Sequence, residues 1–251
     1  MKLYYFSSGP REGVFKRILD MGINVEGVFV TDPDSAPKIM PTIDLAKENN
    51  IPVQVVKKSE LLTFYQVLSP EILCFSAGFK YLFPKAFLDH FKLVLNVHGT
   101  LLPHYGGART LNWIIENGEL QSGITVHKID TGIDTGPVLL QRSFDITPFD
   151  TGKSLYRKTL EFEPQVVEEA LRLILDEKAS FTAQVYNNVI AHPNRTPEHS
   201  RIDPSLPLCD LINKIRAADS ETYPAYFDYH GEKMGIKLFR VNKKDEEKDT
   251  L

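Results

Sequence analysis

An asparagine and a histidine stand two residues apart near the middle of the chain, in the stretch LNVHGTLLPHYGG. Side chains two apart in a strand point to the same face, so Asn96 and His98 are expected to project together. An amide N–H and an imidazole can both stabilise the oxyanion that forms when a carbonyl is attacked. The residues after His98 are rich in Gly and Pro and leave room for a ligand at the end of the strand.

A glycine-rich loop with two aspartates, DTGIDTGPV, lies between two apolar strands further along the chain. Its glycines let the backbone approach a flat ligand closely. A carboxylate beside His98 would favour the imidazolium by charge attraction and could also accept a proton. Taken singly, the Asn-x-His pair also fits an ordinary buried histidine. The Asp-Thr-Gly alone also fits a plain turn or an aspartic protease, but such proteases are all-β.

Short apolar strands alternate with helices before these motifs and predict the sheet that must position them. The expected strands are 2–6, 25–30, 51–56, 71–76 and 93–97, and the expected helices are 13–21, 43–50, 59–68 and 84–91. Strands that are nearly all apolar indicate a parallel sheet covered on both faces, whose ligand site lies beyond the carboxyl ends of the strands. His98 falls at that edge.

The second half of the chain adds a helix over 108–118, strands over 123–129 and 136–146, and a long helix over 151–176. A proline-rich stretch, a helix over 209–218 and a hairpin around 230–232 come after them. We therefore expect a Rossmann-like, mostly parallel α/β sheet with helices on both faces, in residues 1–180, and a small helix-and-hairpin appendage in residues 181–251. Trp113 is expected to pack its helix on the sheet, and His127 is expected to have no function.

The composition is that of a globular protein. It argues against a nucleic-acid-binding, zinc-binding, disulfide-rich or membrane-spanning protein. The 251 residues carry a formal net charge of −4, which gives no electrostatic reason to expect nucleic-acid binding. The two cysteines, Cys74 and Cys209, suggest neither a zinc site nor a disulfide framework, so no metal is expected. No signal peptide is apparent, and no apolar run approaches the ~20 residues that span a membrane. A cytoplasmic protein is expected.

The motifs LNVHGTLLPHYGG, TLNWIIENGE and SGITVHKIDTGIDTGPVL, with the spacing among them, resemble the formyltransferases that use N10-formyltetrahydrofolate. The resemblance covers residues 1–176 and implies a formyltransferase catalytic domain over residues 1–180. The family's catalytic Asn, His and Asp match Asn96, His98 and Asp134. In the implied mechanism, an amine attacks the formyl carbon, Asn96 and His98 stabilise the oxyanion, and Asp134 assists proton transfer.

The C-terminal part resembles the segment after the catalytic domain in the methionyl-tRNA and aminoarabinose enzymes of this family. The chain ends before a large basic β domain of the methionyl-tRNA type, and a tRNA substrate needs a phosphate-contacting surface. The resemblance therefore implies a nucleoside-diphosphate-linked amino sugar as the substrate, with a role in lipopolysaccharide O-antigen biosynthesis. The hairpin could pair across a two-fold axis in a homodimer. A glycinamide-ribonucleotide or methionyl-tRNA formyltransferase, or a non-catalytic nucleotide-sugar-binding protein, stays open as an alternative.

Family precedent also implies ligand contacts in the loops beyond the sheet. The residues expected against the folate are Phe79, Lys80, Tyr81, Leu82, Asp130 and Gly132. The residues expected against the sugar nucleotide are Ser7, Ser8, Gly9, Arg11, His104, Tyr105 and Arg109. Backbone N–H groups after the first strand suit an anion, and an arginine there can pair with a diphosphate. The loop departs from the family pattern, because Gly106 and Thr110 stand where many relatives have Arg and Pro.

Overall fold

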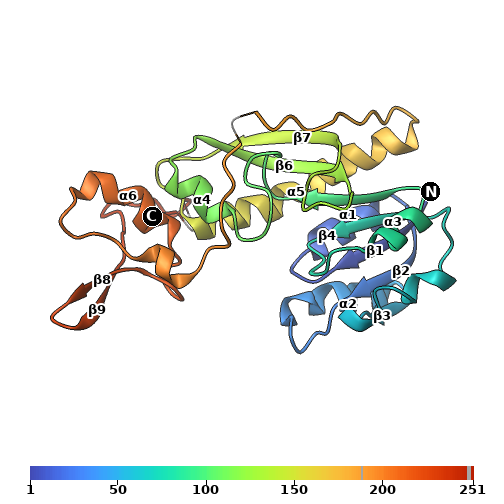
Figure 1. Cartoon of the computed structure of the whole chain (residues 1–251), viewed down its shortest axis with the longest axis horizontal. Helices are drawn as coiled ribbons and strands as arrows, with labels where there is room; N and C mark the ends of the chain where they lie inside the picture. Colours follow the sequence, from blue (N-terminus) through green and yellow to red (C-terminus); the bar gives the residue numbers. More distant parts are fainter. Residues whose placement is uncertain (188, 248–249) are drawn as a thin grey trace.

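A computed structural model of the chain describes residues 1–187, 189–247 and 250–251 (Figure 1). Seven strands form one sheet in the order β3-β2-β1-β4-β5-β6-β7. Five of them are parallel, namely β1 (Lys2–Ser7), β2 (Asn24–Val30), β3 (Val53–Val55), β4 (Leu73–Ala77) and β5 (Val94–His98). The strands β6 (Gln121–Lys128) and β7 (Val138–Asp145) run antiparallel. The predicted mostly parallel α/β sheet is confirmed.

Helices cover both faces of the sheet, because the inner strands are apolar on both sides. One face carries α1 (Glu12–Asp20), α2 (Met40–Glu48) and the long α5 (Gly152–Leu175). The other face carries α3 (Lys85–His90) and the 3₁₀ segments η2 (Lys58–Glu60) and η3 (Phe64–Val67). A further 3₁₀ turn, η1 (Pro37–Ile39), leads into α2. The apolar cluster under α3 includes Phe79, Tyr81 and Phe83 and so holds the loop after β4 in place.

The helix predicted over 59–68 is wrong, since this stretch forms η2 and η3 instead. It contains β-branched and aromatic side chains, which lose rotamer freedom in a helix. Phe64 and Tyr65 are both buried against Phe87. Neighbouring residues of an α-helix do not share one face, so burying both rings favours a tighter and irregular backbone.

The C-terminal elements lie beyond α4 (Leu111–Glu116), at the opposite end of the molecule from β3 (Figure 1). They comprise the 3₁₀ turn η4 (Pro197–Ser200), α6 (Leu208–Ala217) and a hairpin of β8 (Ala225–Tyr229) and β9 (Glu232–Ile236). A small apolar core of their own includes Leu211, Ile215 and Ala225. The predicted helix and hairpin are confirmed. Ala217 also packs on Ile114 of α4, and the division into domains at residue 180 stays a prediction.

Candidate active site

Asn96 and His98 end β5 on the face of the sheet that carries α3, as the period of two predicts. The antiparallel β6 sets His127 opposite Asn96 and Thr125 opposite His98. The Nδ2 atom of Asn96 lies 3.2 Å from Nε2 of His127. The strand register therefore brings a second histidine into the polar cluster at this edge.

Asp134 reaches the same cluster from the loop between β6 and β7. Its φ of 55° is a left-handed conformation that is uncommon outside glycine. The side chain of Gln184 donates to its carbonyl oxygen at 2.8 Å, and the Gly107 N–H donates to its Oδ2 at 2.9 Å. Oδ2 lies 3.4 Å from Nδ1 of His98, and Oδ1 lies 3.6 Å from Nε2 of His127. The three predicted side chains thus meet, with His127 as a fourth member.

The hydrogen bonds of His127 define the orientation of the Asn96 amide. Nδ1 of His127 lies 3.0 Å from the carbonyl oxygen of Lys128, which only accepts, so Nδ1 carries the proton. Nε2 then accepts from one N–H of Asn96. The second N–H and the amide oxygen of Asn96 have no hydrogen-bond partner within the described ranges and are available to a ligand.

His98 is held between two acceptors. Its Nε2 lies 3.2 Å from the carbonyl oxygen of Tyr105, and its Nδ1 faces the Asp134 carboxylate. Burial lowers the pKa of His98, and the charge of Asp134 and the Tyr105 carbonyl oppose that shift. Nε2 therefore faces a carbonyl acceptor, while Nδ1 and the facing carboxylate oxygen can both accept a proton. This gap between two acceptors is suited to receiving a proton.

Asp134 stays ionised in this setting. Burial by itself raises the pKa of a carboxyl group. The positive charge that His98 carries when protonated, together with the Gly107 N–H, outweighs burial and holds the pKa of Asp134 well below its usual range. A carboxylate that is ionised at neutral pH can accept a proton or hold an imidazolium.

A cavity of about 90 Å³ opens from the cluster toward the loop after β4. Ser76, Asn96, His127 and Asp134 form its polar end. Five of the six residues expected against the folate line it, namely Phe79, Tyr81, Leu82, Asp130 and Gly132. Lys80 is not among the described lining residues, and its backbone N–H donates to Ser8 Oγ at 2.8 Å. The cavity combines a wall of aromatic rings with a glycine-bearing loop.

The residues expected against the sugar nucleotide fall into two groups. Ser8, Gly9 and Arg11 follow β1 beside the end of β4. Ser7 is fully buried and donates to the carbonyl oxygen of Ala77 at 2.8 Å, so its side chain is directed into the sheet rather than toward a ligand.

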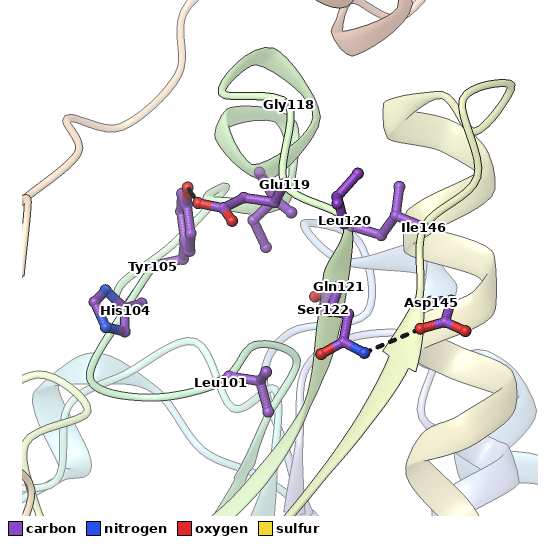
Figure 2. Close-up of a pocket in the computed structure, with 11 residues that line it drawn as sticks. Leu101, His104, Tyr105, Gly118, Glu119, Leu120, Gln121, Ser122, Asp145 and Ile146 are labelled. Atoms are coloured by element: carbon purple, nitrogen blue, oxygen red, sulfur yellow. Dashed lines mark hydrogen bonds between the residues drawn. The ribbon is translucent and has the colours of Figure 1, made fainter.

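His104 and Tyr105, in the loop after β5, belong to the second group and line a separate, larger cavity of about 850 Å³ (Figure 2). Glu119 and Asp145 contribute carboxylates to its walls, and its described lining residues include no Lys or Arg. Arg109 is exposed on the same loop, with a φ of 59°.

Tyr105 connects the loop between β5 and α4 to the C-terminal part of the chain. Its ring stacks on His192 at 4.8 Å, and His192 stacks on Trp113 at 5.6 Å. The indole N–H of Trp113 donates to the Pro193 carbonyl oxygen at 2.9 Å. The prediction that Trp113 packs its helix on the sheet is therefore wrong, because the indole lies against residues 192–199 instead.

The expectation that His127 has no function is at odds with this geometry. His127 and Thr125 are two apart on one strand and share a face, so the alternation that unites Asn96 and His98 applies to them as well. The antiparallel register of β5 and β6 then decides that this face meets Asn96. The register depends on how the two strands pair, so the sequence of either strand alone does not predict that His127 lies opposite Asn96.

Within the described ranges, no cluster of three or more His, Cys, Asp or Glu side chains is placed to hold a metal ion. None of the helices in those ranges combines the length and the apolar character that crossing a bilayer requires.

Comparison with known proteins gives consistent matches. A family model described as formyl transferase matches residues 21–171. The methionyl-tRNA formyltransferase of Caldanaerobacter subterraneus is 32% identical over 237 residues, covering 90% of this chain and 75% of that protein. A sugar N-formyltransferase from Shewanella has a similar fold, with a TM-score of 0.76 and 19% identity over 97% of this chain and 99% of that one. The N-formyltransferase from Helicobacter canadensis in complex with folinic acid and dTDP-3-aminofucose gives a TM-score of 0.67 and 24% identity, over 86% and 79%.

Proposed function

The chain belongs to the formyl transferase family, and from this membership we propose that it moves a formyl group from N10-formyltetrahydrofolate to the amine of a nucleoside-diphosphate-linked amino sugar. It is a formyltransferase, and the choice of amine is the proposed part. The observation that carries the reaction is the meeting of Asn96, His98 and Asp134 beside one cavity, which Asn96 and Asp134 line. Residues 1–180 would form the catalytic domain, and residues 181–251 the appendage.

The cavity at the cluster suits the co-substrate, which supplies the formyl carbon. Its rings and its glycine-bearing loop match a flat heterocycle with hydrogen-bonding edges. Phe79 stacks on Phe83 at 5.3 Å and forms a fixed wall. Tyr81, Leu82 and Gly132 would contact the pterin at the rim.

The polar cluster accounts for the transfer step. The free N–H of Asn96 would donate to the oxyanion that develops on the formyl oxygen. The proton released by the attacking amine would enter the gap between Nδ1 of His98 and Oδ2 of Asp134. The imidazolium formed there would stabilise the oxyanion by charge, while Asp134 would hold the imidazolium in place.

We propose that the acceptor binds on the side of the cluster near β1. Arg11 lies there and can pair with a diphosphate, and backbone groups at Ser8 and Gly9 adjoin it. The larger cavity beside His104 and Tyr105 suits a diphosphate poorly, because carboxylates line its walls (Figure 2). The net charge of −4 favours a small anionic substrate over a tRNA. The homodimer, the cytoplasmic location and the O-antigen role stay predictions.

A direct assay tests the proposal. Purified protein, N10-formyltetrahydrofolate and a panel of dTDP-, UDP- and GDP-linked amino sugars should give one product that has gained the mass of a formyl group. Methionyl-tRNA belongs in the same panel, because the Caldanaerobacter enzyme with that name is 32% identical. Transfer to methionyl-tRNA or to glycinamide ribonucleotide, with none to any sugar, would overturn the proposed substrate.

A further inference from the structure

Arg11 and Glu163 form a buried ion pair beneath the end of β1. The backbone N–H of Arg11 donates to the Gly9 carbonyl oxygen at 2.8 Å, which turns the chain sharply into α1. Nε of Arg11 lies 2.6 Å from Oε2 of Glu163 in α5. The side chain of Glu163 has no exposed surface, whereas 14% of the Arg11 side chain remains exposed. The Glu163 carboxylate is therefore closed off from solvent, whereas the Arg11 side chain is still partly exposed.

Burying the Glu163 carboxylate completely costs free energy, and the packing of the fold does not account for that cost. Oε1 and Oε2 of Glu163 and Nε of Arg11 all lack a well-aligned hydrogen bond among the described residues, so the two side chains interact by charge. Burial raises the pKa of Glu163 to about 7, against the opposing charge of Arg11. Well-packed apolar side chains often replace a buried ion pair without loss of stability. We therefore attribute the pair to the position that it gives the Arg11 side chain, and not to a contribution to stability.

Both partners lie against the ends of strands that border the proposed site. A Cβ added to Gly99, the residue after His98, would lie 3.6 Å from Oε1 of Glu163. A Cβ added to Gly78, at the end of β4, would lie 3.8 Å from Cγ of Arg11. The arginine accordingly extends across the carboxyl edge of the sheet at the centre of its strand order, where α/β sheets place their ligands.

We infer that Glu163 is a positioning residue. Its carboxylate fixes Arg11 so that the terminal nitrogens of the guanidinium bind the phosphate of the acceptor. With Nε paired by charge with Glu163 and the Tyr156 ring 5.9 Å from the guanidinium carbon, the terminal nitrogens of Arg11 are the groups that can meet phosphate oxygens. An arginine that is already fixed loses less conformational freedom when the anion binds. The inference rests on the proposed function for the identity of the acceptor, whereas the anion site can be measured without any acceptor.

Inorganic pyrophosphate serves as the probe, in calorimetric titrations at about pH 8, where Glu163 is ionised. Glu163→Gln keeps the shape of the side chain and removes its charge, and it should weaken pyrophosphate binding about tenfold, or roughly 1.4 kcal/mol. Glu168→Gln is the matched control, because Glu168 lies on the same helix and pairs with Arg17 of α1. The control should bind as the unmodified protein does. Absence of pyrophosphate binding to the unmodified protein would overturn the inference.

A double-mutant cycle shows whether Glu163 acts through Arg11. In an Arg11→Met background, Glu163→Gln should have no further effect on binding. An equal loss in both backgrounds would overturn the inference. Glu163→Asp, which shortens the side chain, gives the same cycle if Glu163→Gln does not fold.

Kinetics separate this role from a purely structural one. Glu163→Gln should raise the KM for the acceptor and leave kcat unchanged. A fall in kcat at constant KM would instead indicate an effect through Gly99 and His98, and would overturn the assignment. If no amino sugar is formylated, the proposed substrate fails, and the pyrophosphate titrations still decide the role of Glu163.

Discussion

His127 and Asn96 face each other across the β5–β6 ladder, with Nε2 of the ring 3.2 Å from Nδ2 of the amide. The opposite ring nitrogen bonds to the carbonyl oxygen of Lys128, so the ring cannot turn without losing a partner. The same ring lies 3.6 Å from Asp134. A side chain expected to have no function therefore joins the amide and the carboxylate of the proposed site.

Replacing Asn96, His98 or Asp134 by alanine should slow turnover by about 10²–10³-fold in each case. Each side chain either donates to the developing oxyanion or receives the proton, so its loss acts on the transition state. Single-turnover kinetics with saturating folate and acceptor measure the effect, and thermal melting confirms that each variant folds. Near-normal turnover in one variant would remove that residue from the mechanism.

His127→Phe should lower kcat by about 10-fold to 10²-fold, less than the loss of Asn96 itself. The phenyl ring fills the same space but cannot accept from Asn96, so the amide is no longer held in one orientation. Steady-state kinetics with His230→Phe as the control, at the exposed tip of the hairpin, give the comparison. Equal kcat values in the two variants would show that the contact has no catalytic value.

Asp134→Asn should lower the pKa of His98 further. Burial already lowers this pKa, and the carboxylate of Asp134 opposes the shift by charge attraction. Without that charge, burial and the nearby His127 and Arg11 lower the pKa of His98, opposed by the Tyr105 carbonyl. The ring should therefore become protonated only in more acidic solution. NMR titration of the His98 ring protons measures this, and an unchanged midpoint would contradict the pairing.

Glu163 should make the fold less stable as pH rises through the neutral range. Its pKa is about 7 in the folded chain, against a usual 4.5, because of burial. Between these values the folded chain keeps a proton that the unfolded chain has lost. The free energy of unfolding therefore falls with rising pH in this window, by roughly 3 kcal/mol in total.

Melting temperatures between about pH 5 and about pH 8 test this slope. The loss of stability with rising pH should be smaller in Glu163→Gln than in the unmodified protein, since His98 and His192 also titrate in this range, and Glu168→Gln should match the unmodified protein. Tyr5 and Arg11 also lie beside Glu163, but their pKa values are raised further above the neutral range and do not contribute. An identical slope in Glu163→Gln would show that Glu163 does not titrate there.

His192→Ala should destabilise the protein by about 1 kcal/mol, since the ring stacks between Tyr105 and Trp113. Because the Tyr105 carbonyl oxygen accepts from His98, kcat should also fall. Denaturant unfolding and steady-state kinetics measure the two effects, with His230→Ala as the control. Normal kcat in a destabilised His192→Ala would show that the stack supports the C-terminal part alone.

Local patterns in the sequence predicted most of the fold. Apolar strands alternating with helices predicted a covered parallel sheet, because burial on both faces demands such strands. The prediction was wrong at 59–68, where the burial of Phe64 and Tyr65 overrides helical spacing. Trp113 was also placed wrongly, since its partner is a segment with no regular structure and no periodic pattern.

The sequence by itself determined that Asn96 and His98 share a face at the end of a strand, and that a glycine-bearing loop carries Asp134. Only the tertiary structure decided which groups meet them: His127 across the ladder, Glu163 beneath Arg11, and His192 against Tyr105. The reason is physical. Periodicity and turn chemistry belong to one segment, whereas strand register and helix depth depend on how distant segments pack.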